Sequence, residues 1–279
     1  MSDCYTFQRT IQKRGSLSGP GIHTGEFCRV TFSPLSSGEG LQFFRDGRRV
    51  SLTPSADSKH CTSLGQNGTE IKTVEHCLAA LGGLGIDNLK VEVEGPEFPA
   101  LDGSAIGFVE CLKGLGFKDF SSRKEACRIE EPLFCHEPGR AIVIYPSEHF
   151  RISYILDYEH PLLRGQKVDF TLTPEVFEKE IAPSRTFCTQ AESQSLRQNG
   201  LGIGATHENT LVISKNGPVG NHFRFTDECA RHKVLDILGD LSLLGFSVIG
   251  HVVGIRSGHS LNRKLGEAIQ KVKDSHGKS

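Results

Sequence analysis

Two hydrophobic periods alternate along this chain. Residues 89–94 (Leu-Lys-Val-Glu-Val-Glu) alternate apolar and charged side chains, which predicts a strand with one buried face. The leucine-rich stretch that follows Thr73, a residue suited to an N-cap, ends at Gly82-Gly83 and predicts a helix. By these criteria we expect strands at residues 27–32, 41–45, 89–94, 140–145, 150–156 and 246–255, and helices at residues 73–81, 106–115, 261–273 and from about His232 to Gly245.

The two halves of the chain repeat one order of elements. His76 is followed by a leucine-rich helix, a Leu-Gly-Ile turn and a strand, and His232 by a leucine-rich helix, a Leu-Gly-Phe turn and a strand. This self-similarity predicts a duplicated α+β unit, with helices on one face of each sheet. The polar residues 118–131 lie between the halves, so we place the domains at residues 1–124 and 125–279.

Composition narrows the class of protein. The 279 residues are 37% hydrophobic and 23% charged with a net charge of −1, which gives no argument for nucleic-acid binding. The nine cysteines form no Cys-x-x-Cys pair, which argues against a disulfide framework and for a reducing compartment. The first five residues do not resemble a secretory signal, and no apolar run approaches the ~20 residues of a membrane span. We therefore expect a cytosolic protein.

The most chemically informative stretch is the helix that carries His232. Asp236 follows His232 by four residues, so one helix face presents an imidazole and a carboxylate to the same point. Both groups are preferred ligands of zinc. Asp240 extends this polar face by one further turn. The alternative is an ordinary polar stripe on a solvated helix face.

Further titratable residues lie at the starts of two other helices. Glu75 and His76 are adjacent and diverge by ~100° on a helix, so one would bind a metal while the other acts as a general base. An ordinary first-turn glutamate that interacts with the helix dipole is the alternative for Glu75. His259 follows Gly258, and a nearby carboxylate such as Asp240 would raise its pKa. His259 could equally be a surface residue.

Several short motifs occur together in one order. They are residues 21–25 (Gly-Ile-His-Thr-Gly), 73–76 (Thr-Val-Glu-His), 85–88 (Gly-Ile-Asp-Asn), 101–104 (Leu-Asp-Gly-Ser), 184–187 (Ser-Arg-Thr-Phe), 224–225 (Arg-Phe), 231–240 (beginning Arg-His-Lys) and 257–259 (Ser-Gly-His). In this order and spacing the chain resembles the UDP-3-O-acyl-N-acetylglucosamine deacetylases, the zinc enzymes of lipid A biosynthesis. The resemblance covers about residues 8–270, nearly the whole chain.

The resemblance implies two α+β sandwich domains with the metal site between them. It assigns a Zn²⁺ ion to His76, His232 and Asp236, with a fourth position open to water as a catalytic site requires. Fe²⁺ shares these ligand preferences and could be the ion used in the cell.

The resemblance also implies roles for the residues around the metal. Glu75 would take the proton of the attacking water, and either Glu75 or His259 would protonate the leaving amine. Thr186 and the protonated His259 would stabilise the oxyanion. Asp240 would keep His259 charged.

Other residues are implied to bind the substrate. Lys233 would face the diphosphate, with Arg256 as a second basic contact. Tyr158 would lie near the uridine, and Phe187 would also contact the substrate. Residues 188–211 correspond to the insert that shelters the acyl chain in the family, although core packing explains the apolar residues of this segment equally well.

Three residues near the implied site do not fit the family pattern simply. Cys188 stands where the family more often has glycine, which could alter the mouth of the acyl passage. Cys61 lies in a segment near the metal, where we favour a buried thiol over an extra ligand. The resemblance places His23 near the site and assigns it no role.

The sequence therefore predicts a metal-dependent amidohydrolase that releases acetate from a UDP-linked, 3-O-acylated N-acetylglucosamine. We expect this lipid-linked UDP-sugar as the small-molecule partner, no nucleic-acid partner, at most peripheral membrane contact, and a monomer. One alternative is a hydrolase of the same architecture that acts on another acyl amide or sugar nucleotide. The other is a binding module with a structural metal site, which would require four protein ligands where we find three.

Overall fold

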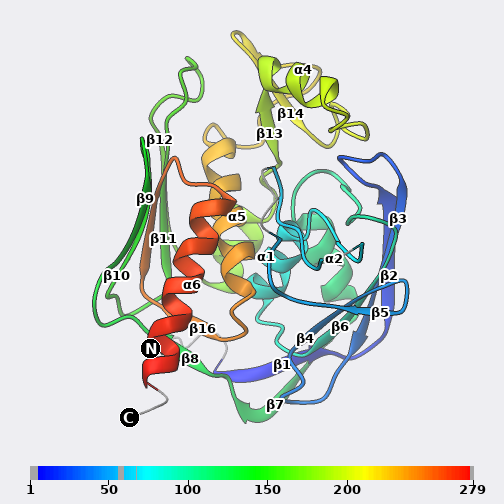
Figure 1. Ribbon diagram of the computed structural model, residues 1–279, viewed down its shortest axis with the longest axis vertical. Helices are drawn as coiled ribbons and strands as arrows, with labels where there is room; N and C mark the ends of the chain where they lie inside the picture. Colours follow the sequence, from blue (N-terminus) through cyan, green and yellow to red (C-terminus); the bar gives the residue numbers. More distant parts are fainter. Residues whose placement is uncertain (1–5, 56–59, 67, 277–279) are drawn as a thin grey trace.

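The structure is a computed structural model that describes residues 6–55, 60–66 and 68–276. The five N-terminal residues, on which the expected absence of a secretory signal rests, lie outside this part of the chain. The described residues form two units of helices and strands, one from each half of the sequence (Figure 1).

The first unit is built on a five-stranded sheet. Its strands are β2 (Gly15–Pro20), β3 (Phe27–Pro34), β4 (Leu41–Arg45), β5 (Arg48–Val50) and β6 (Leu89–Glu94), in the spatial order β2-β3-β6-β4-β5. β4 and β6 are parallel, and the other neighbours are antiparallel. The predicted alternation is present in β6, where Leu89, Val91 and Val93 are buried. Helices α1 (Glu75–Leu84) and α2 (Ile106–Gly114) pack on the inner side of this sheet.

The second unit repeats this topology. Its strands are β9 (Leu133–Glu137), β10 (Arg140–Tyr145), β11 (Arg151–Leu156), β12 (Gln166–Thr171) and β17 (His251–Ile255), in the order β9-β10-β17-β11-β12. β11 and β17 are parallel, and the other neighbours are antiparallel. Helices α5 (Glu228–Ser242) and α6 (His259–His276) take the places of α1 and α2. The matching strand orders confirm the predicted duplicated α+β fold.

The helices of both units lie between the two sheets, and α1 packs along α5 (Figure 1). Glycine permits this close packing. A Cβ atom on Gly239 would lie 2.3 Å from the carbonyl oxygen of Glu75, and one on Gly82 would lie 2.1 Å from Ser242 Oγ. The start of α1 is therefore held beside the middle of α5, where the predicted metal ligands lie.

Several element boundaries differ from those predicted. Helix α5 begins at Glu228 and ends at Ser242, and α1 continues through Gly82 and Gly83 to Leu84. Helix α1 begins at Glu75, and Thr73 precedes it in a left-handed conformation (φ 57°) rather than serving as its N-cap. The single strand expected at residues 246–255 is two strands, β16 (Ser247–Ile249) and β17, separated by Gly250, where a Cβ would lie 2.9 Å from Ile144. Helix α6 begins at His259, two residues earlier than expected, because its first turn is polar and lacks the apolar period.

The polar segment at residues 118–131 is not a plain linker. Strand β7 (Phe117–Arg123) pairs with β1 (Phe7–Ile11), and β8 (Ala126–Arg128) pairs with β16. Most side chains of β7 are exposed, so this strand shows no apolar alternation. The domain boundary after residue 124 remains a prediction.

The predicted insert forms a small projection at one end of the molecule (Figure 1). It contains β13 (Phe187–Thr189), α4 (Gln190–Gln198) and β14 (Leu211–Ser214), continued by β15 (Gly217–Pro218). Before it, a short helix α3 (Pro174–Val176) continues into a π-helical turn η1 (Phe177–Ile181). Among the described residues, no helix has the length and apolar character needed to cross a membrane.

Candidate active site

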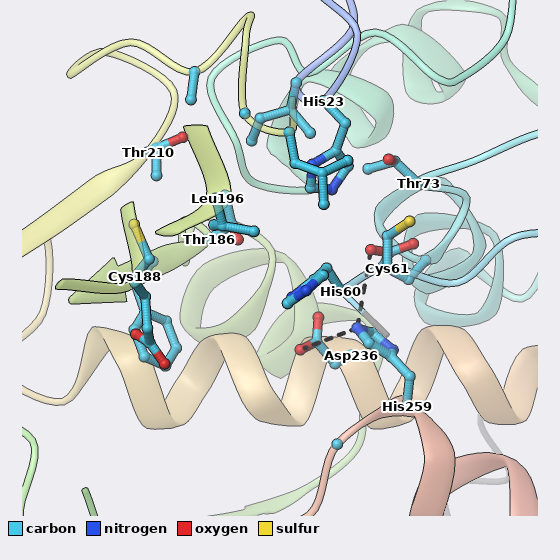
Figure 2. Close-up of a pocket in the computed structure, with 18 of the residues that line it drawn as sticks. His23, His60, Cys61, Thr73, Thr186, Cys188, Leu196, Thr210, Asp236 and His259 are labelled. Atoms are coloured by element: carbon cyan, nitrogen blue, oxygen red, sulfur yellow. Dashed lines mark ion pairs between the residues drawn. The ribbon is translucent and has the colours of Figure 1, made fainter. Parts of the chain in front are cut away.

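The candidate site lies where α1, α5 and the start of α6 meet the insert. A cavity of about 1010 Å³ opens there, and its walls come from both units. The structure brings most of the predicted site residues to this cavity: Glu75, His76, Tyr158, Thr186, Phe187, His232, Lys233, Asp236, Arg256 and His259. Asp240 lies behind His259 rather than in the cavity wall. Figure 2 shows His259, from the start of α6, reaching toward Asp236 on α5.

His76, His232 and Asp236 form a group suited to a metal ion. One ligand atom from each lies within 4.8 Å of the other two, and all three residues are buried. His232 Nδ1 lies 3.0 Å from the Ser184 carbonyl oxygen, which can only accept a hydrogen bond, so this nitrogen carries the proton. His232 Nε2 is then an unprotonated acceptor, 3.3 Å from Asp236 Oδ1, which itself receives no hydrogen bond. Two acceptors that face each other fit a bound cation between them.

The protonation states of these three residues also suit metal binding. Burial lowers the pKa of His76 to about 3, and the positive form of His232 would lower it further. Burial likewise lowers the pKa of His232, although Asp236 opposes the change. Burial alone would raise the pKa of Asp236, but the positive charge of Lys233, together with those of His232, His259 and His76, holds that pKa well below its usual range. The site therefore offers two neutral imidazoles and one carboxylate, the forms that bind metal.

Lys233 has a contact that the sequence reasoning missed. Its Nζ atom donates a hydrogen bond to Asp236 Oδ2 over 2.7 Å, which leaves Asp236 Oδ1 for the metal position. Burial disfavours the charge on Lys233, but Asp236, together with Tyr158 and Tyr154, raises the lysine pKa. The side chain is 20% exposed and lines the cavity, so it also faces the space where a substrate would bind. The i,i+3 spacing of the two residues was the available signal.

Glu75 is buried beside the three candidate ligands. Its Oε2 atom accepts a hydrogen bond from the backbone N–H of Thr62 (3.0 Å), and its Oε1 atom lies 4.0 Å from His259 Nε2. Burial raises the pKa of Glu75 to about 7, although the positive charge of His259 opposes this shift. A carboxylate with such a pKa can accept and return a proton near neutral pH.

His259 is held by Asp240, as the sequence predicted. The imidazole Nδ1 lies 2.9 Å from Asp240 Oδ2, which also accepts a hydrogen bond from Asn262 Nδ2 over 2.8 Å. The hydroxyl of Thr62 donates to the other oxygen of Asp240. Burial would lower the pKa of His259, but the charge and hydrogen bond of Asp240, together with the charges of Asp236 and Glu75, raise this pKa to about 9. His259 is therefore a cation at neutral pH.

Sequence reasoning did not identify Thr62 and Asn262 as partners in this arrangement. Asn262 follows His259 by three residues on α6, so helical spacing alone could have indicated it. Thr62 lies far away in sequence and is brought to the site by the segment before α1. No local pattern indicates such a residue.

The predicted substrate-binding residues line different walls of the cavity. The Phe187 ring contacts His232 edge-on with centroids 6.3 Å apart, and contacts Tyr158 at 6.0 Å. Lys233 Nζ lies 5.6 Å from the Phe187 ring centre. Arg256 is exposed and has a left-handed backbone conformation (φ 52°). Thr186 is anchored through its N–H to the carbonyl of Gly103 over 2.8 Å, which links the insert to the first unit.

His23, Cys61 and Cys188 also line the cavity (Figure 2). Burial lowers the pKa of His23 to about 4, and its Nδ1 atom is buried without a hydrogen-bond partner. Burial raises the pKa of Cys61 to about 11, so Cys61 is a neutral thiol at pH 7, and among the described residues it is not part of the candidate metal group. Burial raises the pKa of Cys188 in the same way, to about 11.

Fold and site together define a class of protein. It is a duplicated α+β protein with a candidate metal centre between its two units, and the titratable Glu75 and His259 lie beside that centre. A family model for LpxC, UDP-3-O-acyl N-acetylglycosamine deacetylase, matches residues 8–271, and the chain belongs to this family.

Several similar proteins are named UDP-3-O-acyl-N-acetylglucosamine deacetylase. The protein from Myxococcus xanthus is 39% identical over 92% of this chain and 84% of its own length. The protein from Syntrophotalea carbinolica is 38% identical over 94% of this chain and 87% of its own. The protein from Geobacter sp. (strain M21) is 35% identical over 97% of this chain and 91% of its own length.

Proposed function

We propose that this protein hydrolyses the acetamide of UDP-3-O-(3-hydroxyacyl)-N-acetylglucosamine, giving acetate and UDP-3-O-acyl-glucosamine, the committed step of lipid A biosynthesis. Its family membership and the names of its relatives support this substrate. The observation that carries the proposal is the meeting of His76, His232 and Asp236 with Glu75 and the charged His259 in one cavity between the two units.

We propose zinc as the bound ion, held by His76, His232 and Asp236; Fe²⁺ satisfies the same donors. The two facing acceptor atoms and the ionised Asp236 support a cation at this point. When bound, such an ion polarises a carbonyl group and increases the acidity of water. The second oxygen of Asp236 stays with Lys233, which keeps the carboxylate oriented.

In the proposed reaction, Glu75 takes a proton from the water that attacks the acetamide carbonyl carbon. Thr186 and the positively charged His259 stabilise the negative oxygen that develops there. The carbon–nitrogen bond then breaks, and the nitrogen leaves as an amine after it receives a proton from His259 or from Glu75. Asp240 supports this sequence because it keeps His259 charged and oriented.

The remaining contacts follow from the shape and charge of the cavity. Lys233 and Arg256 supply positive charge for the diphosphate, and Tyr158 and Phe187 supply aromatic surface for the uridine side. The insert at residues 188–211 provides an apolar wall for the acyl chain. A monomer in the cytosol remains our prediction.

The test is acetate release from UDP-3-O-acyl-N-acetylglucosamine by the purified protein, as isolated, after chelation, and after zinc is added back. We expect turnover that chelation abolishes and zinc restores, and we expect His232→Ala to lose it. If the folded, metal-loaded protein releases no acetate, the proposed substrate is wrong. Activity on other N-acyl sugars but not this one would favour a different hydrolase of the same architecture.

A further inference from the structure

The turn between β2 and β3, residues 21–25, lies beside the insert (Figure 1), and Ile22 and His23 in it line the cavity. The N–H of Ile203 donates to the carbonyl oxygen of His23 over 3.2 Å, and the N–H of Gly204 donates to that of Ile22 over 3.1 Å. A Cβ on Gly204 would lie 2.0 Å from the carbonyl oxygen of Gly21. Backbone therefore meets backbone at this junction, and only glycine fits at position 204.

A buried carboxylate fixes this turn from behind. Glu97 Oε1 accepts three hydrogen bonds, from the N–H of His23 (3.0 Å), the N–H of Thr24 (3.1 Å) and the hydroxyl of Thr24 (3.1 Å). Glu97 is fully buried, and a Cβ on Gly21 would lie 1.7 Å from the same oxygen. A carboxylate with all these donors holds the turn in one conformation.

The helical part of the insert is largely exposed. Helix α4 has no buried residue, and Ile203 is 65% exposed. The apolar side chains of Leu196 and Leu201 nevertheless line the cavity. A second anchor, the N–H of Thr186 on the Gly103 carbonyl, holds the start of the insert rather than the loop after α4. Within the second unit, the buried Asn209 side chain also donates to the Gly204 carbonyl oxygen over 3.0 Å. The junction with residues 21–25 is what joins this loop to the first unit.

We propose that Glu97 is a positioning residue that determines specificity for the acyl chain. Through the turn at residues 21–25 it fixes the loop at residues 201–204, and with it the apolar wall formed by Leu196 and Leu201. This inference rests on the proposed function, because it assumes that the acyl chain of the substrate lies along the insert.

The test compares two substrates that differ only in the 3-O-acyl chain, a butyryl and a myristoyl ester. We expect Glu97→Ala and Gly204→Ala to lower kcat/KM for the myristoyl substrate about tenfold, mainly through KM, and to change the butyryl reaction little. Glu97→Gln should retain most of the selectivity, because its amide oxygen can still accept from residues 23 and 24. The matched controls are Glu94→Ala, on an exposed residue, and Gly114→Ala, where a Cβ meets nothing within 4 Å.

Hydrogen exchange gives a readout that is independent of catalysis. The amides of Ile203 and Gly204 should exchange faster in Glu97→Ala than in the wild-type protein. The inference would be overturned if Glu97→Ala and Gly204→Ala lowered kcat/KM equally for the two esters. It would also be overturned if both variants kept the wild-type ratio of kcat/KM between the two esters. A folded, metal-loaded wild-type protein that releases acetate from neither ester would instead show that the proposed function is wrong.

Discussion

At the scale of single residues, the charge on His259 depends on groups from several elements. Asp240 and Asp236 face its imidazole from α5, and Glu75 faces it from α1. Asn262, on the same helix as His259, donates to the Asp240 oxygen that contacts the imidazole. The protonation of His259 is thus set by carboxylates that are distant in sequence. Asp240, the nearest of them, lies 19 positions away.

We expect Asp240→Asn to lower kcat about 10- to 100-fold and to change its pH dependence. In the proposed reaction His259 acts in its charged form, which is present below its pKa and lost above it. Without the Asp240 charge, the pKa of His259 falls from about 9, so activity should decline at a lower pH than in the wild type. The measurement is kcat/KM as a function of pH, with metal content determined in parallel.

Asn262→Ala is the matched control for this prediction. Its side chain contacts the same Asp240 oxygen but carries no charge, so the basic limb of its pH profile should move much less. An Asp240→Asn profile that coincides with that of the wild type would show that His259 is not the group that titrates there.

At the scale of elements, the distance between α1 and α5 decides whether the candidate ligands meet. The two helices touch where Gly239 faces the backbone of Glu75, one residue before His76. A side chain at position 239 has no flexible neighbour to displace, because the atom that it would meet belongs to the backbone. The helices themselves would have to separate.

Gly239→Ala should therefore destabilise the protein by about 1–3 kcal/mol and weaken metal binding, because overpacking pushes the two helices apart. The measurements are denaturant unfolding and metal affinity. Gly266→Ala, in α6, is the control, since its Cβ would make only ordinary contacts at 3.8 Å and 3.9 Å. That control should keep or gain stability from its higher helix propensity. Equal effects of the two variants would refute this account of Gly239.

The elements with a clear period were predictable from sequence, and those without one were not. The bounds of β4, β6 and β10 are as predicted, because their apolar residues alternate or cluster between turns. Strand β7 escaped prediction because its side chains are mostly exposed and polar. The candidate metal ligands His232 and Asp236 show helical spacing, whereas Thr62 joins the site only through tertiary folding, which leaves no local pattern.

At the scale of the whole molecule, the two units contribute unequally to one site. The first supplies Glu75 and His76, and the second supplies His232, Asp236 and His259. An ion held by this group would connect the units directly, in addition to the packing of α1 on α5.

Removal of the ion by a chelator should therefore lower Tm. Binding to the folded state alone contributes about 4 kcal/mol when the free ion is present at about 1000 times its Kd. In His232→Ala, chelator and zinc should no longer change Tm, whereas His149→Ala, on an exposed residue, should respond like the wild type. Differential scanning fluorimetry measures both. An equal response of His232→Ala and wild type would place the ion elsewhere.

The matching strand orders of the two units have a consequence for how the chain tolerates change. Duplication commonly leaves a spare copy, and a spare copy can absorb damage. Here the architecture is repeated but the chemistry is divided, since each unit carries residues that the other lacks. If a candidate site residue is lost from one unit, the other unit has no equivalent residue to replace it. The repeated architecture therefore does not protect the site against substitution.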